Sequence, residues 1–214
     1  MARAKAKAYK EQSFDQLHGL DGISDDQVAE HLKLYSGYVK QVNGLNEQID
    51  EMVRKGKPSG TDPHFAEITR HLGFEYNGMI LHEYYFSNLR PAAEPAPPSS
   101  SGLVHALNDA FGSLDAWTTD FQAMGDMRGI GWVILFQDPA TDRLTNHWIS
   151  LHQDGVPAGF KPLLVMDVWE HAFMRDYKAT EKAKYVEAFF RNVCWQTVER
   201  RLHEHSAIRP AAAA

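Results

Sequence analysis

The segment MDVWEHAFMRDY, residues 166–177, places Asp167 and His171 four positions apart, with a second carboxylate, Glu170, beside the histidine. On an α-helix, residues i and i+4 share one face with their Cβ atoms about 5–6 Å apart, so both side chains can reach one cation. The alternative is that Asp167 caps a helix and His171 packs beneath it. The pair alone does not establish a metal site, and further ligands must come from elsewhere in the chain.

The C-terminal half of the chain contains three short runs rich in β-branched and aromatic residues. They are GWVILF (131–136), LTNHWISLH (144–152) and PLLVMDVW (162–169), separated by the turn-rich stretches DPATDR and QDGVPAGFK. This pattern is typical of a small antiparallel sheet. We expect two helices before the sheet, at 103–112 and 114–124, and a helical C-terminus from Lys182 through Arg201 after it.

The N-terminal half shows apolar residues at helical spacing. Ser24 is a plausible N-cap for a long amphipathic helix over residues 25–53. After the turn-rich KGKPSGTDP, Asp62 and Pro63 supply a cap followed by proline at the first helical position, and a second helix is expected to run to about Leu89. The two helices are expected to pack as an antiparallel hairpin.

The Pro- and Ser-rich stretch RPAAEPAPPSSSG, residues 90–102, is the clearest domain boundary. The sequence therefore predicts an α+β fold, in which an N-terminal antiparallel helical hairpin is followed by an α/β domain with a small antiparallel sheet of about three strands. The expected division is 1–90 for the N-terminal arm and hairpin, 91–102 for the linker, 103–205 for the α/β domain and 206–214 for a frayed tail.

The composition is that of an ordinary globular protein, with 43% hydrophobic and 23% charged residues and a net charge of -6. That charge, without a basic stripe, argues against nucleic-acid binding. A small anionic substrate remains compatible with it, because the local potential at a site matters more than the total charge. No apolar run approaches the roughly 18 residues of a membrane span.

Cysteine content and the first residues bear on the compartment. The single cysteine, Cys194, excludes an intrachain disulfide and a thiolate metal site, and it fits a reducing cytoplasm. The basic opening MARAKAKAYKEQ lacks the apolar core of a secretory signal. We therefore expect a cytoplasmic location and a flexible N-terminal arm.

The eleven histidines differ in their neighbourhoods. His31 lies on the first predicted helix, seven residues before Tyr38 and therefore on nearly the same face. His82 lies in the aromatic stretch ILHEYYF of the second helix, where it either makes a core hydrogen bond or binds a metal. Surface or structural roles are expected for histidines in polar or isolated positions: His18, His64, His71, His105, His147, His203 and His205.

One histidine on each arm of the hairpin, with Asp167 and His171 near the end of a buried strand, supplies three nitrogen ligands and one oxygen ligand. Such a set suits iron or manganese, and also zinc. The proposed metal ligands are therefore His31, His82, Asp167 and His171. Glu30 is a rival for the first position, which we assign to His31.

The stretch DVWEHAFMRDY resembles the D-x-W-E-H-A-x-x-x-D-Y motif of the iron/manganese superoxide dismutases. Further similar segments follow the family's order: SDDQVAEHLKLYSGYV, LHEYYFSNL, GIGWVIL, the HQD of LHQDG, and Trp195. The resemblance covers about residues 20 to 205. It implies a helical hairpin followed by an α/β domain, the four ligands above with solvent as the fifth, and conversion of superoxide to oxygen and hydrogen peroxide by redox cycling of the metal.

The resemblance also implies roles for residues around the metal. Tyr38 is expected at the substrate funnel, within the hydrogen-bond network of the bound solvent. Gly78 stands one helical turn before His82, where the iron-type pattern commonly has a glutamine. The space is expected to receive Gln153 from the other domain, or His152 if that loop is shifted by one residue. This arrangement favours manganese, or tolerance of both metals, over strictly iron.

Residues at the edge of the site are expected to join two subunits. The resemblance implies that Trp132 and Trp169 form an apolar wall and that Glu170 bridges to the ligand histidine of a twofold partner, so we expect a homodimer. The family usually has a histidine and a tyrosine that meet across this interface. Here those positions hold Tyr35, or Leu34, and Met174. These two positions form the gateway to the site in the family, and here both are changed. A second function therefore stays open, that of a non-catalytic metal-binding or assembly protein of the same fold.

Overall fold

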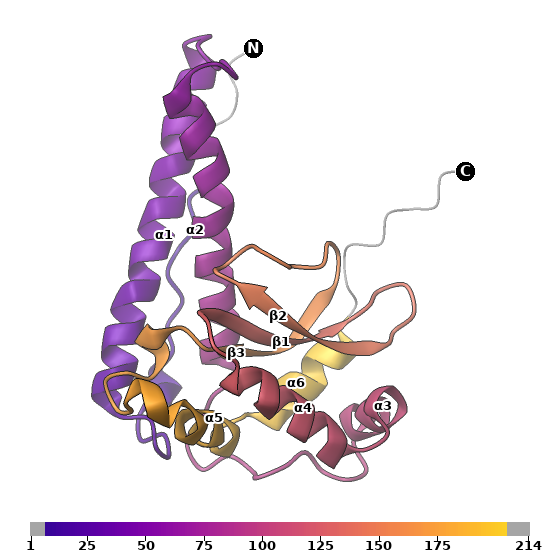
Figure 1. Cartoon of the computed structure of the whole chain (residues 1–214). Helices are drawn as coiled ribbons and strands as arrows, with labels where there is room; N and C mark the ends of the chain where they lie inside the picture. The colour runs from indigo at the N-terminus through magenta and orange to yellow at the C-terminus, as the bar shows by residue number, and fades with distance from the viewer. Residues whose placement is uncertain (1–6, 205–214) are drawn as a thin grey trace.

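The N-terminal part of the protein is a hairpin of two long helices, as seen in a computed structural model that describes residues 7–204. Helix α1 (Asp25–Arg54) begins at Ser24, whose hydroxyl accepts a hydrogen bond from the backbone N–H of Gln27 at 3.0 Å. Helix α2 (Pro63–Ser87) begins at Asp62, which caps the N–H of His64. Both predicted caps are confirmed. In Figure 1 the two helices run side by side and extend beyond one end of the sheet.

From Tyr9 onward the chain before α1 contacts the hairpin, whereas residues 1–6 of the expected flexible arm lie outside the described residues. Tyr9 and Asn43 exchange two hydrogen bonds, and the backbone N–H of Gln12 donates to the Tyr35 hydroxyl. A short 3₁₀ helix, Asp15–Leu17, follows and buries Leu17. These contacts hold the segment along α1 and α2 because they satisfy its backbone polar groups.

The C-terminal part is built on a three-stranded antiparallel sheet with the strand order β2-β1-β3. The strands are β1 (Gly131–Gln137), β2 (Leu144–Ser150) and β3 (Lys161–Asp167). Trp132 pairs with Ile149 on one side and with Asp167 on the other. The predicted fold class and strand number are therefore confirmed.

Four α-helices accompany the sheet and gather beneath it in Figure 1. Helices α3 (Gly102–Phe111) and α4 (Leu114–Asp126) precede it, whereas α5 (Lys182–Arg191) and α6 (Trp195–His203) follow it. Short 3₁₀ helices lie at Glu170–Ala172 and Ala179–Glu181. No helix among residues 7–204 has a stretch long and apolar enough to cross a membrane.

The helical C-terminus is not continuous, contrary to expectation. Residues 192–194 leave the helical path and run beside the end of α2, where Arg90 N–H donates to Asn192 O and Cys194 N–H donates to Asn88 O. The Asn192 side chain also donates to the backbone oxygens of Asp21 and Ala188. Pairing with residues 88–90, just after α2, therefore interrupts the helix. The expected frayed tail, 206–214, lies outside the described residues.

One hydrophobic core joins the hairpin to the sheet. It contains residues from α1, α2, all three strands and the later helices, including Tyr85, Trp132 and Phe189, each exposed by no more than 2%. Helix α2 packs directly on β3. Side chains from both halves of the chain are thereby brought together where the hairpin meets the end of β3.

Candidate metal centre

Four side chains from four separate elements meet at the junction of the hairpin and the sheet. His31 comes from α1, His82 from α2, Asp167 is the last residue of β3, and His171 lies in the 3₁₀ helix Glu170–Ala172. One nitrogen or oxygen of each lies within 4.8 Å of all the others. Asp167 and His171 therefore do meet, but a strand end and a tight turn bring them together and not one face of an α-helix.

The geometry is centred on one carboxylate oxygen. Asp167 Oδ2 lies 3.1 Å from Nε2 of His31, 3.1 Å from Nε2 of His171 and 3.6 Å from Nε2 of His82. The other oxygen, Oδ1, accepts the backbone N–H of Trp169 at 2.8 Å, which fixes the carboxylate plane. Glu30, the rival for the first position, is exposed and pairs with Lys33.

His82 is the strongest indication that a cation belongs at this point. Its Nδ1 lies 2.5 Å from the backbone oxygen of Gly78, which can only accept, so Nδ1 carries the hydrogen and Nε2 presents a lone pair. Within the described part of the chain, this completely buried Nε2 has no hydrogen-bond partner. A buried polar atom without a partner is costly, and a metal ion would satisfy it.

Burial sets the charge state of the cluster. It lowers the pKa of His31 and, more strongly, that of His82, so these imidazoles are held neutral. Burial alone would raise the pKa of the Asp167 carboxyl, but His171 and His31 outweigh it and the pKa lies below its usual value. The cluster thus offers neutral imidazole nitrogens and one anionic oxygen, a donor set that fits iron or manganese.

Tyr38 and His152 form a hydrogen-bonded pair beside the cluster. Tyr38 Oη lies 2.7 Å from His152 Nε2, and the indole N–H of Trp132 donates to His152 Nδ1 at 3.0 Å. Burial lowers the pKa of His152 to about 4. A neutral His152 whose Nδ1 accepts from Trp132 carries its hydrogen on Nε2, so it donates to Tyr38 and leaves the phenolic hydrogen free to donate elsewhere.

The position expected for Gln153 is taken by His152. His152 is fully buried, whereas Gln153 is exposed. The cause is the turn after β2, where Ser150 and Asp154 exchange two backbone hydrogen bonds and Leu151 adopts a left-handed conformation with φ 54°. With this turn, His152 faces inward and Gln153 faces solvent, so His152 is the residue that lies beside Tyr38.

The space beside Gly78 is filled by a different side chain from the one expected. A Cβ placed on Gly78 would lie 2.6 Å from Cδ1 of Tyr38 and 2.7 Å from its Cε1. The ring of Tyr38, and not a glutamine side chain from the other domain, therefore occupies this space. Burial, followed by the charges of Asp167 and Glu75, raises the pKa of Tyr38, so the phenol stays protonated at neutral pH.

Two tryptophans lie against the histidine rings of the cluster. The Trp132 ring is completely buried and lies edge-on to His82 at 5.0 Å between centroids. Trp169 stacks on His152 at 4.8 Å and on His171 at 5.6 Å, and its indole N–H donates to Leu151 O. Both rings therefore pack directly on imidazoles at or beside the cluster.

The edge of the site is open in the single chain. The His171 side chain is 26% exposed, and Glu170 beside it is exposed. Met174 is 47% exposed. Tyr35 points the other way and is buried, with its hydroxyl donating to Glu83 Oε1 and accepting from the backbone of Gln12, both at 2.9 Å.

Three residues of α2 near the site were not predicted from the sequence. Phe74 lies edge-on to His152 at 4.5 Å between centroids, and His71 stacks on Phe74 and bonds to Glu75. The surface or structural role expected for His71 did not specify this pairing. The four-residue spacing of His71 and Glu75 on a predicted helix was the available signal, because such residues face each other.

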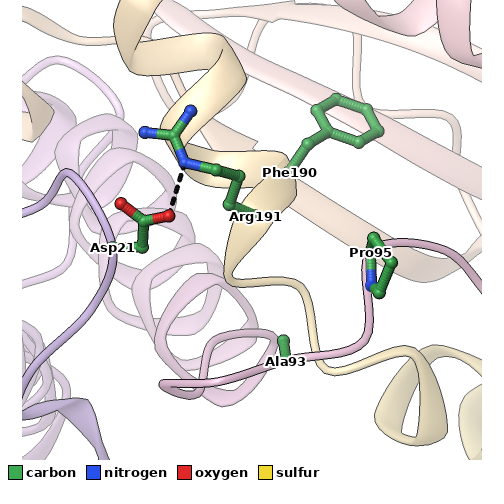
Figure 2. Close-up of a pocket in the computed structure, with 5 residues that line it drawn as sticks. All are labelled: Asp21, Ala93, Pro95, Phe190 and Arg191. Carbon is green, nitrogen blue, oxygen red and sulfur yellow. Dashed lines mark ion pairs between the residues drawn. The ribbon is translucent and has the colours of Figure 1, made fainter.

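A shallow surface cavity of about 280 Å³ lies elsewhere on the molecule. Figure 2 shows its lining side chains: Arg191 pairs with Asp21 at 2.9 Å, and Phe190, Pro95 and Ala93 complete the lining. None of these residues belongs to the metal cluster, so the cavity is not part of the centre.

Comparison of this sequence with known proteins shows which family the chain belongs to. The family model for the iron/manganese superoxide dismutases, C-terminal domain, matches residues 99–201. A superoxide dismutase [Fe] of Aquifex pyrophilus is 32% identical over 188 residues, 86% of each chain. One from Methanothermobacter thermautotrophicus, also [Fe], is 34% identical over 85% of this chain and 87% of its own. A superoxide dismutase [Mn] of Mycolicibacterium fortuitum is 36% identical over 80% of each chain. With these similarities over most of its length, this chain belongs to the iron/manganese superoxide dismutases, a family of oxidoreductases.

Proposed function

We propose that this protein is an active superoxide dismutase that binds one manganese or iron ion per subunit through His31, His82, Asp167 and His171. The observation that carries the proposal is the convergence of these four side chains within 4.8 Å, with the buried Nε2 of His82 unpaired among the described residues. The chemistry that the metal supplies when bound is one-electron exchange between trivalent and divalent states. One superoxide is oxidised to oxygen, and the next is reduced with two protons to hydrogen peroxide.

The side chains of the site have distinct parts in this reaction. Asp167 contributes the negative charge that favours the trivalent ion, while the neutral imidazoles keep the divalent state accessible. His152 donates to Tyr38, so Tyr38 can direct its own O–H toward a bound anion or solvent molecule and hold a proton there. Trp132 and Trp169 exclude bulk water, which strengthens these hydrogen bonds.

Position 78 on α2 holds a glycine, where the iron-type pattern commonly has a glutamine. Activity with manganese, or with both metals, is therefore favoured over activity with iron alone. The relatives above carry both the [Fe] and the [Mn] names. Loading the protein separately with each metal and measuring superoxide decay per bound ion tests the choice. We expect the manganese form to be active, and a protein active only with iron would contradict this part of the proposal.

A second function has one specific observation in its favour. Tyr35 and Met174 stand where the family usually has its gateway pair, and Tyr35 is turned toward Glu83 and Gln12. A non-catalytic metal-binding or assembly protein of the same fold would tolerate this change. Metal-loaded protein that leaves superoxide decay unchanged would support the second function and exclude the first.

We further propose a cytoplasmic homodimer. Glu170 and His171 are accessible at the surface of the single chain, where a twofold copy can bring the Glu170 carboxylate of one subunit to the His171 ring of the other. Such a bond would orient the ring and satisfy a carboxylate that otherwise faces only solvent.

A further inference from the structure

Gln27 carries a buried amide in the first turn of α1, four residues before the proposed ligand His31 and on the same face of the helix. The residue is only 2% exposed. A buried amide is costly unless its polar atoms are hydrogen-bonded, so the partners of Gln27 show which part of the molecule it holds.

Both polar atoms of the Gln27 amide bind the backbone of the segment that carries His171. Nε2 donates to the backbone oxygen of His171 at 2.6 Å, and Oε1 accepts the backbone N–H of Arg175 at 3.1 Å. A carbonyl oxygen only accepts and a backbone N–H only donates, so these partners fix which way the amide faces. The two bonds therefore hold both ends of residues 171–175 against the first turn of α1.

Further contacts between α1 and this segment lie closer to the surface. Asp176 accepts hydrogen bonds from the backbone N–H and the hydroxyl of Ser24, at 2.7 and 2.6 Å. Arg175 pairs with Asp26 at 3.2 Å, but these side chains are 53% and 79% exposed, and exposed ion pairs contribute little. Gln27 adds a link between α1 and the segment that is shielded from solvent.

His171 is less enclosed by packing than the other proposed ligands. Its side chain is 26% exposed, whereas those of His31, His82 and Asp167 are exposed by no more than 2%. His171 Nε2 and His31 Nε2 each lie 3.1 Å from Asp167 Oδ2, although the two histidines come from elements far apart in the chain. A hydrogen bond to the backbone oxygen of His171 fixes the point from which its ring reaches the cluster.

We propose that Gln27 is a positioning residue that holds His171 in the place where its ring completes the ligand set with His31. The proposal rests on the proposed function, because it takes both histidines as metal ligands. Without the two amide bonds, residues 171–175 can move away from α1. A bound metal is then held less tightly, and the geometry of its ligands changes.

The test uses the full-length protein loaded with manganese. Two properties are measured: the rate at which a chelator removes the metal, and the electron paramagnetic resonance spectrum of bound Mn(II), which responds to the geometry of its ligands. Gln27→Met keeps the length of the side chain and removes both hydrogen bonds. We expect this variant to release the metal about tenfold faster than the wild type and to change the spectrum.

A second variant keeps the test decisive if Gln27→Met does not fold. Gln27→Glu retains an acceptor for the Arg175 N–H, but at neutral pH it places an ionised oxygen opposite the backbone oxygen of His171. This variant should also release the metal faster and change the spectrum.

Two controls on the same helix separate the positioning of His171 from general stability. Gln41→Met makes the same change at an exposed position and should leave both properties as in the wild type. Val42→Ala removes packing from a completely buried position, so it should lower the free energy of unfolding and leave the spectrum unchanged.

A Gln27→Met protein with the release rate and the spectrum of the wild type would overturn the role of Gln27. The same spectral change in Val42→Ala would also overturn it, because general destabilisation would then explain the effect. Faster release and a changed spectrum in Gln27→Met, when the wild type does not accelerate superoxide decay, would contradict the proposed activity alone. The two failures are therefore distinguishable.

Discussion

The ring of Tyr38 on α1 occupies the space that a side chain at Gly78 on α2 would need, with 2.6 Å between Tyr38 Cδ1 and a Cβ at that glycine. Gly78→Ala should therefore displace Tyr38, lengthen its 2.7 Å contact with His152 and lower the rate of superoxide decay per bound metal. Overpacking of this kind costs about 1–3 kcal/mol of unfolding free energy. Assays of decay and chemical denaturation measure both effects.

Gly73 supplies the control for this substitution, because it lies on the same helix and a Cβ there would meet nothing within 4 Å. Gly73→Ala should leave activity unchanged and stabilise the protein by up to about 1 kcal/mol. Equal effects of the two substitutions would show that helix propensity, and not the position of Tyr38, is responsible.

His152 should matter to the reaction and Gln153 should not. His152→Ala removes the side chain that lies between Tyr38 and Trp132, and a hydrogen-bonding residue of this kind typically contributes about 10–100-fold to metal affinity or activity. Gln153→Ala removes an exposed side chain and should have no effect. Superoxide decay normalised to metal content distinguishes the two, and the reverse pattern would restore Gln153 as the functional residue.

The free energy of unfolding of the metal-free protein should fall as the pH is lowered from about 6.5 to about 4. Burial lowers the pKa of His152 to about 4, whereas a histidine in an unfolded chain titrates near about 6.5. Between these values the unfolded chain binds a proton that the folded chain does not, so acid favours unfolding. The pKa values of His31 and His82 are also lowered, in the same direction.

Denaturant titrations at a series of pH values measure this dependence. His152→Gln should make it less steep, because one of the contributing groups is removed. A slope that is the same in the wild type and the variant would show that His152 does not contribute.

Arg201 on α6 joins the hairpin to the sheet. This side chain is almost fully buried, with 6% of the residue exposed. Its guanidinium donates to Leu163 O on β3 and to the Asn88 side chain. It also donates to Tyr84 O and to the Ser87 hydroxyl at the end of α2. Arg201→Leu removes these four hydrogen bonds and deprives buried acceptors such as the Asn88 side-chain oxygen of this partner, so it should destabilise the protein by about 2–4 kcal/mol. The neighbouring Arg200→Leu removes only an exposed contact with Glu204 and should change stability by less than about 1 kcal/mol.

Thermal and chemical denaturation of the two arginine variants, with metal content measured in parallel, provides the comparison. If Arg201→Leu were as stable as Arg200→Leu, the hairpin would be held to the sheet by apolar packing alone.

Glu170 should determine the oligomeric state. Glu170→Ala removes the carboxylate proposed to reach His171 of the partner subunit, so it should shift the protein from dimer toward monomer in sedimentation velocity. Glu187→Ala, an exposed glutamate on α5, should leave the dimer intact. A monomeric wild type would contradict the proposed dimer directly.

The helices and strands could be predicted from the sequence where the spacing of apolar residues is regular. Ser24 and Asp62 cap α1 and α2 as expected, and the three β-rich runs form the sheet. The break at residues 192–194 could not be predicted, since it depends on hydrogen bonds to Asn88 and Arg90, about a hundred residues away along the chain.

The positions of the site residues could not be predicted where they depend on the conformation of a turn. Asp167 and His171 have i, i+4 spacing, but the chain between them forms a strand end and a 3₁₀ turn, because Asp167 pairs within the sheet opposite Trp132. Likewise the left-handed Leu151 decides that His152 faces inward and Gln153 outward. A single backbone conformation of this kind leaves little signal in the sequence, since non-glycine residues rarely adopt it.

The most direct measurement of the central claim is the rate of superoxide decay per bound metal ion, compared between the wild type and His82→Gln after identical loading with manganese. We predict about one metal ion per wild-type chain and rapid decay, with loss of both in the variant, since His82 Nε2 is buried and faces the other three proposed ligands. A wild type that holds manganese without accelerating decay, or a variant that retains metal and activity, would contradict it.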